Sequence, residues 1–193
     1  YFKIDDLLTD EHKLIRQSVR DFVDNEIKPV IDDAAQHHKD ITDLMKKLGA
    51  IGALGPYIPE EYGGAGLDQM SYGLIMQELE RGDSAVRSAA SAQSSLVMYP
   101  IFSFGSEEQK QKYLPKLASG EFIGSFGLTE PNHGSNPGGM ETRLSKNGDH
   151  YILNGAKMWI TNSPICDIAV VWARDEEGKI RGVIVERGMQ GVT

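Results

Sequence analysis

Residues 105–131 read GSEEQKQKYLPKLASGEFIGSFGLTEP, and this stretch divides the chain into a helical part and a β-rich part. Ser106 followed by Gln109 has the spacing of a capping box, which begins a helix, and Gly120 is placed to end that helix. Residues 122–128, which follow, combine apolar and aromatic side chains with glycines, a pattern typical of a strand. We therefore expect helices before residue 120 and strands after it.

The amino-acid composition changes at the same point. Residues 1–120 contain 16 Val, Ile and Thr residues, whereas residues 121–193 contain the same number in 73 positions, together with 11 of the 21 glycines. β-branched residues between frequent turn residues favour strands. The predicted fold class is α+β, with an all-α helical domain over residues 1–120 and an antiparallel β-domain over residues 121–193.

The helical part carries repeated start signals, because Thr9, Asp40 and Asp68 can each cap a helix and Ser84 begins another. Pro29 breaks or restarts the first helix, and the helix from Ser84 reaches Tyr99, just before Pro100. The first helix has an apolar face with helical spacing, formed by Leu14, Ile15, Val19, Phe22, Val23 and Ile27. Several amphipathic helices of this kind predict a helical bundle.

The β-rich part predicts consecutive strands over residues 122–128, 140–146, 149–154, 156–162, 167–173 and 180–186. Asn147-Gly148 and Glu177-Gly178 are hairpin-turn signals. Strands that follow one another without helices argue against a dinucleotide-binding βαβ fold.

The composition of the whole chain excludes several function classes. The net charge of −8 lacks the basic surface that non-specific nucleic-acid binding needs. One cysteine cannot form an internal disulfide, and no cysteine–histidine cluster predicts a metal site. No apolar run approaches the roughly 20 residues of a transmembrane helix, so we expect no membrane insertion.

Two segments of the β-rich part could carry chemistry. Residues 127–139 form a loop dense in glycine and proline, where backbone N–H groups with Thr129 and Ser135 could hold a phosphate or a flavin edge. An ordinary surface loop is the other interpretation. Trp159, beside Thr161, is either a core residue or an aromatic wall facing a planar cofactor. The residues alone leave both questions open.

The helix that begins at Ser84 has an interior of unusually small side chains. Arg87, Ser91 and Ser94 or Ser95 lie on one face of it. An arginine beside hydroxyl groups can bind a carboxylate or a phosphate through two hydrogen bonds. A solvated arginine on a tightly packed helix is the alternative.

Taken together, several motifs resemble the acyl-CoA dehydrogenase family in order and spacing along the whole chain. They are Ile58-Pro59-Glu60-Glu61-Tyr62-Gly63-Gly64, Gly105-Ser106-Glu107-Glu108-Gln109, Tyr113-Leu114-Pro115, Leu128-Thr129-Glu130-Pro131, Gly134-Ser135 and Trp159-Ile160-Thr161-Asn162. The resemblance implies a helical domain, a middle β-domain, of which residues 121–193 would be the first part, and a C-terminal helical domain outside this chain. The catalytic glutamate would lie in that third domain, beyond Thr193, so no residue here is predicted as the base.

Within the family, the glutaryl-CoA dehydrogenases are the most similar group, through residues 87–98 and 126–132. The resemblance implies that Arg87, with Ser88, Ser91 and Ser135, binds the substrate, Arg87 holding the distal carboxylate. The residues that would bind FAD are Phe126, Gly127, Leu128, Thr129, Ser135, Trp159, Ile160 and Thr161. Asn136 stands where the family usually has aspartate.

The implied reaction is FAD-dependent α,β-dehydrogenation of glutaryl-CoA, with decarboxylation, to crotonyl-CoA, as in lysine and tryptophan degradation. The implied partners are electron-transferring flavoprotein and further copies of the chain in a homotetramer. The location would be the bacterial cytoplasm or the mitochondrial matrix. Alternatives are another short-chain or dicarboxylyl acyl-CoA substrate, an oxidase or monooxygenase on the same fold, or a non-catalytic truncated scaffold fragment.

Overall fold

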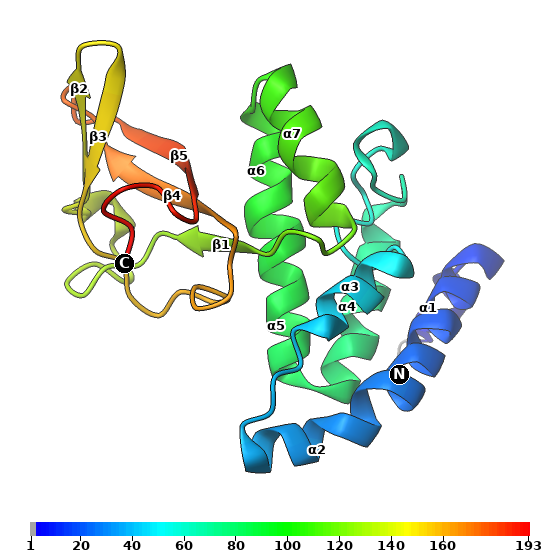
Figure 1. Cartoon of the computed structure of the whole chain (residues 1–193). Helices are drawn as coiled ribbons and strands as arrows, with labels where there is room; N and C mark the ends of the chain where they lie inside the picture. The colour runs from blue at the N-terminus through cyan, green and yellow to red at the C-terminus, as the bar shows by residue number, and fades with distance from the viewer. Residues whose placement is uncertain (1–2) are drawn as a thin grey trace. The chain divides into compact units, whose positions relative to one another are not determined.

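The chain divides into two compact units, Tyr1–Phe122 and Ile123–Thr193, in a computed structural model that describes residues 3–193 apart from the side chain of Ile4 (Figure 1). The predicted domain boundary after residue 120 lies close to this division. Residues 1 and 2 of the predicted first domain lie outside the described residues.

The first unit is helical. Its α-helices are α1 (Asp10–Phe22), α2 (Lys28–His37), α3 (Asp43–Ala50), α4 (Gln69–Gly82), α5 (Ser84–Ser91), α6 (Tyr99–Phe104) and α7 (Glu107–Ala118). Short 3₁₀ turns occupy Ile4–Leu7 and Glu60–Tyr62. Three predicted caps are confirmed, because the side chains of Thr9, Asp68 and Ser106 each accept a hydrogen bond from the third residue of the helix that follows.

Two wide turns make longer helical runs out of these elements. Val23–Ile27 joins α1 to α2 and Ala92–Met98 joins α5 to α6, both as π-helix with bonds that span five residues. The prediction that the helix from Ser84 ends before Pro100 is therefore wrong, because the run continues to Phe104. Pro100 is the second residue of α6 and Pro29 the second residue of α2, so each proline directly follows a wide turn inside a continuous helical run. α-Helical bonding resumes at Lys28, next to Pro29, where the first helix was predicted to break or restart.

Two smaller expectations for this unit are also wrong. Asp40 does not cap α3; its carboxylate accepts a hydrogen bond from the backbone N–H of Thr42, one residue before the helix begins. Leu14 is 68% exposed, although it belongs to the predicted apolar face of α1. The buried part of that face is narrower than predicted, since Val19 is the buried residue of α1, which packs on α4.

The core of the first unit consists of apolar side chains, and each of the seven α-helices that the structure describes there contributes at least one of them. Those with almost no exposed surface include Val23, Ile27, Leu48, Leu54, Ile58, Leu79, Met98, Leu114 and Leu117. Burying a side chain of this size contributes roughly 1.5–3 kcal/mol, so this core is the main source of the unit's stability.

The second unit is built on one sheet, with strands β1 (Gly124–Gly127), β2 (Arg143–Asn147), β3 (His150–Asn154), β4 (Ile168–Arg174) and β5 (Ile180–Glu186). β4 is the central strand, pairing in parallel with β1 and with the start of β2, and antiparallel with β5. Figure 1 shows β2 and β3 as the yellow hairpin. Gly148 and Gly178, at the two predicted hairpin turns, both have positive φ, which glycine adopts without strain.

Two expectations for the sheet need correction. The sheet is mixed, whereas the sequence predicted antiparallel pairing throughout. β4 runs parallel to β1 and to β2, and the β2–β3 and β4–β5 hairpins are antiparallel. Residues 156–162 form no strand, since Trp159 and Asn162 have φ of 60° and 67° and turn the chain away from an extended path. These residues form a turn-rich segment beside the start of the sheet.

Candidate functional site

Arg87 lies in the first turns of α5 and is half-buried. Its Nε donates to Oε2 of Glu80, in the last turn of α4, at 2.6 Å, and its Nη1 lies 3.5 Å from Oγ of Ser91. The hydrogen bond from Arg87, followed by one from Ser84, lowers the pKa of Glu80. The guanidinium is therefore oriented by the Glu80 carboxylate, a partner that the sequence did not predict, and lies beside the Ser91 hydroxyl, which the sequence placed on the same helix face.

The serines around Arg87 have different roles in the structure. Ser91 Oγ donates to the carbonyl of Ser88 at 3.1 Å, and Ser95 Oγ donates to the carbonyl of Ser91 at 2.7 Å. Ser94 is fully buried, and its hydroxyl accepts from the N–H of Gly55. Of these hydroxyls, that of Ser91 is the one placed beside the guanidinium, while Ser88 contributes its carbonyl.

In the second unit, the predicted cofactor residues lie on two segments that meet. The N–H of Met158 donates to the carbonyl of Thr129 at 2.9 Å, which joins the 127–130 segment to the 157–162 segment. Phe126, in β1, packs edge-on against Trp172 with ring centroids 6.0 Å apart. Gly127 is buried and Leu128 and Thr129 are half-buried. The structure thus brings the backbone of Thr129 to the residue before Trp159.

Trp159 is the most unusual of these residues. Its side chain is 83% exposed and its φ of 60° is left-handed, a conformation that strains a residue with a large side chain. The indole ring therefore lies outside the core of its unit, so the interpretation of Trp159 as a core residue is wrong. Ile160 is half-buried, and Thr161 and Ser135 are exposed, so that two hydroxyls and an aromatic ring are open to a ligand.

A buried carboxylate supports the same two segments. The side chain of Glu130 is 3% exposed and accepts hydrogen bonds from the N–H groups of Glu141 at 2.5 Å and Thr142 at 3.0 Å, and from the Thr142 hydroxyl. Lys157 Nζ lies 2.8 Å from Glu130 Oε1. Burial alone would raise the pKa of Glu130, but these hydrogen bonds, led by that from Lys157, lower it to about 2.

Sequence reasoning did not find Glu80, Glu130 or Lys157 as functional residues. Glu80 precedes Arg87 by seven residues, but the two lie on different helices, so helical periodicity does not relate them. Glu130 and Lys157 are 27 residues apart and meet through the fold alone. The sequence does contain one signal that could have pointed to this pair: Glu130 and Lys157 are charged residues inside motifs that are otherwise apolar or turn-forming.

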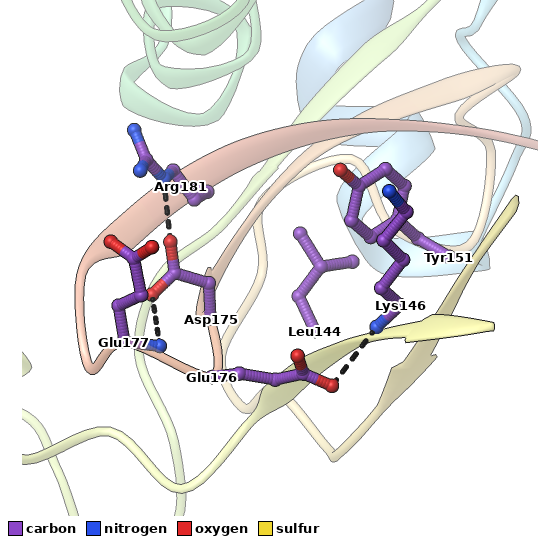
Figure 2. A pocket seen from close by; sticks show the side chains of 7 residues that line it. All are labelled: Leu144, Lys146, Tyr151, Asp175, Glu176, Glu177 and Arg181. Atoms are coloured by element: carbon purple, nitrogen blue, oxygen red, sulfur yellow. Dashed lines mark hydrogen bonds and ion pairs between the residues drawn. The ribbon is translucent and has the colours of Figure 1, made fainter. Parts of the chain in front are cut away.

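A shallow pocket of about 420 Å³ lies elsewhere in the second unit, between the β2–β3 hairpin and the β4–β5 turn. Figure 2 shows Leu144, Lys146, Tyr151, Asp175, Glu176, Glu177 and Arg181 around it. The Asp175 carboxylate is bound by Arg181 and by backbone N–H groups of its own turn. None of the predicted site residues lines this pocket, and we assign it no role.

The described part of the chain contains neither a metal-binding cluster nor a membrane-spanning helix. No three histidine, cysteine, aspartate or glutamate residues among residues 3–193 are grouped so that they could hold a metal ion. None of the helices that the structure describes is long and apolar enough to cross a membrane.

Comparisons with known proteins give the same family for both units. The family model for the acyl-CoA dehydrogenase N-terminal domain matches residues 9–121, and that for the middle domain matches residues 125–193. A probable acyl-CoA dehydrogenase of Bacillus subtilis strain 168 is 45% identical over 188 residues, which are 96% of this chain and 32% of that protein. The mitochondrial isovaleryl-CoA dehydrogenase of Pongo abelii is 40% identical over 95% of this chain and 45% of its own length.

Among solved structures, a glutaryl-CoA dehydrogenase of Mycobacterium smegmatis, in complex with FADH2, matches with a TM-score of 0.96 and 46% identity. The match covers 100% of this chain and 49% of that one. The chain therefore spans about half the length of that relative, and a third to a half of the two curated relatives.

Proposed function

Because the chain belongs to the acyl-CoA dehydrogenase family, we propose that the complete protein catalyses the FAD-dependent α,β-dehydrogenation of glutaryl-CoA, with decarboxylation, to crotonyl-CoA. The observation that carries this substrate is the half-buried Arg87, bound to a carboxylate and adjacent to the Ser91 hydroxyl. A solved relative that is 46% identical over the whole chain is a glutaryl-CoA dehydrogenase, which supports the same choice.

The chemistry around Arg87 fits a substrate that ends in an anion. A guanidinium presents several N–H donors in one plane and can bind two carboxylates at once. Glu80 accepts a hydrogen bond from Arg87 Nε, and Ser91 lies near Nη1. The Glu80 carboxylate therefore compensates the charge of Arg87 before the substrate binds. A distal carboxylate would bind to the guanidinium as a second anion or replace Glu80 on it, whereas an apolar acyl end would gain nothing from it.

The residues of the second unit fit a planar redox cofactor. Trp159 offers an exposed aromatic ring, and Thr129, Ser135 and Thr161 offer hydroxyl groups. In the proposed site the predicted set from Phe126 to Thr161 holds FAD, with Thr129 donating to the edge of its ring system. Bound FAD supplies the hydride acceptor for the β-hydrogen of the substrate.

This chain's own contribution is to bind and orient. Arg87, assisted by Ser91, fixes the carboxylate end of the acyl chain, and the joined 127–130 and 157–162 segments fix the cofactor. Correct placement of the reacting groups is worth several orders of magnitude in rate. Electron-transferring flavoprotein as the oxidant and a homotetrameric assembly complete the proposal.

The proposal is tested on the complete protein with glutaryl-CoA and butyryl-CoA as alternative substrates. We expect Arg87→Met to lower kcat/KM for glutaryl-CoA by about 100-fold, because a charge-assisted contact to the carboxylate is lost, and to change butyryl-CoA turnover little. Arg181→Met, which removes an exposed arginine paired with Asp175, is the matched control. Preference for butyryl-CoA by the wild type, with no effect of Arg87→Met, would show that the glutaryl assignment is wrong.

One observation favours a second candidate substrate. Arg87 is already neutralised by Glu80, so the ion pair can serve as a purely structural link between α4 and α5. In that case the substrate is a short or branched acyl-CoA without a second carboxylate, as the name of the isovaleryl-CoA relative indicates for that protein. Adding isovaleryl-CoA to the same assay separates the two, because its turnover would then exceed that of glutaryl-CoA and survive Arg87→Met.

A further inference from the structure

Lys157 makes two contacts that no motif explains. Its side chain is 10% exposed, and its ammonium lies 3.1 Å from the carbonyl oxygen of Leu128 and 2.8 Å from Glu130 Oε1. It thus spans the residues on either side of Thr129. A lysine this deeply buried is rare and is costly unless its charge is compensated.

Glu130 extends the connection to a third segment. Its carboxylate accepts hydrogen bonds from Glu141 and Thr142, so that residues 128–130, 141–142 and 157–158 are tied to one anion. The segments also approach closely at their glycines. A Cβ on Gly155 would lie 2.3 Å from Thr142 Oγ1, and one on Gly127 would lie 3.3 Å from Lys157 Cγ. There is little space in which these segments could shift.

The strained residues of the site follow directly after Lys157. Met158 donates its N–H to Thr129, and Trp159 and Asn162 then have positive φ. The Asn162 side chain is fixed by donating to the carbonyl of Gly124 at 3.1 Å. Left-handed backbone at such residues costs of order 1–3 kcal/mol and persists only where the surroundings enforce it. The Lys157–Glu130 pair and the Asn162 amide are the polar contacts at the two ends of this strained turn.

We infer that Lys157 is a positioning residue for the cofactor site: by joining Leu128, Glu130 and its own segment, it fixes how Thr129 and Trp159 are presented to the flavin. This role rests on the proposed function. Buried ion pairs often contribute little net stability, so apolar residues in place of Lys157 and Glu130 could give an equally stable protein. Apolar residues would not, however, hold the 128–130 and 157–162 segments at one fixed spacing. The predicted consequence is a change in the bound flavin rather than a change in folding alone.

The test uses the complete protein, purified with FAD, and compares wild type with Lys157→Met. We expect FAD to bind at least 10-fold more weakly and, with the site saturated, the visible absorption and circular dichroism bands of the flavin to differ from wild type. Lys179→Met is the matched control, because it removes a lysine that is paired with a glutamate but exposed on the β4–β5 turn. Wild-type spectrum and affinity in Lys157→Met would overturn the inference.

Two further outcomes keep the tests distinct. If Lys157→Met does not fold, the double variant Lys157→Met/Glu130→Gln removes both charges and leaves no unpaired ion, so it is expected to fold, bind FAD at least 10-fold more weakly and show the altered bands. A double variant with wild-type affinity and bands contradicts the positioning role. Wild-type protein that binds no flavin at all overturns the proposed function itself, together with this inference.

Discussion

Among the residues that the structure describes, each unit has one nearly inaccessible glutamate, and the two carboxylates are held by different kinds of donor. Glu78, in α4 of the first unit, is 1% exposed and accepts hydrogen bonds from Arg20 of α1 at 2.7 and 3.0 Å and from Arg81 at 2.7 Å. Glu130 of the second unit is held by one lysine, one hydroxyl and two backbone N–H groups. The first carboxylate binds side chains, whereas half of the hydrogen bonds to the second come from the backbone.

The difference shows what each carboxylate has to maintain. α1 and α4 keep their shape through their own backbone hydrogen bonds, so Glu78 only adjusts how two finished helices pack. The segments around Glu130 have few backbone hydrogen bonds of their own. The Glu130 carboxylate accepts the hydrogen bonds that a neighbouring strand would accept within a sheet. Removing Glu130 should therefore alter local structure, whereas removing Glu78 should alter packing.

The largest effect is expected from Glu130→Ala. The substitution leaves the Lys157 ammonium and two backbone N–H groups buried without their acceptor, which costs about 3–5 kcal/mol. We expect faster hydrogen–deuterium exchange in residues 127–130, 141–142 and 157–162 of the complete protein, together with loss of bound flavin. Glu177→Ala, on an exposed turn, is the control, and unchanged exchange in Glu130→Ala would contradict the comparison.

A smaller effect is expected from Glu78→Gln. Arg20 and Arg81 are partly exposed and can turn toward water, and Arg81 keeps its contact with Asp24 at 2.9 Å. The expected cost is about 1–3 kcal/mol, visible as faster exchange confined to α1 and α4, with the flavin spectrum unchanged. If the spectrum changed as much as in Glu130→Ala, the two carboxylates would not differ in the way we describe.

The smallest effect concerns acid. The pKa of Glu130 is about 2, below the ordinary value, so its stabilising contribution is complete above about pH 4.5 and is lost as the pH falls toward 2. Between pH 5 and pH 3.5 we expect about 1 kcal/mol of local protection to disappear around Glu130 in wild type. Glu130→Gln has no carboxyl group to protonate at this position, so its protection there should stay flat over that range. An equal decline in both proteins would assign the effect to other groups.

How far the sequence predicted this structure depends on whether the signal was local. Thr9, Asp68 and Ser106 act through hydrogen bonds three residues away, and all three caps form as predicted. The failure at residues 156–162 has the opposite origin. Residues 159–161 have strong strand propensity, but they lie in a turn. The residues that flank them, Lys157, Met158 and Asn162, are bound to residues 124 and 128–130.

The same distinction applies to the candidate site. The order of motifs was sufficient to predict the family, and the segments that would hold the cofactor stay a prediction. The ion pairs Glu80–Arg87 and Glu130–Lys157 could not be predicted, because each joins elements whose approach is decided by packing. The residues with chemical character were therefore recognisable, and their charge partners were not.

The wide turn Ala92–Met98 has a consequence for how this helix tolerates change. A turn whose bonds span five residues contains one residue more than an α-helical turn, as a single-residue insertion would produce. That extra residue allows Ala92, Gln93 and Ser94, which are consecutive, all to be buried. Deleting one residue here would restore regular helix and rotate everything after it by about 100°. The residues of α5 and those of α6 therefore keep their orientation relative to one another only through this irregular turn.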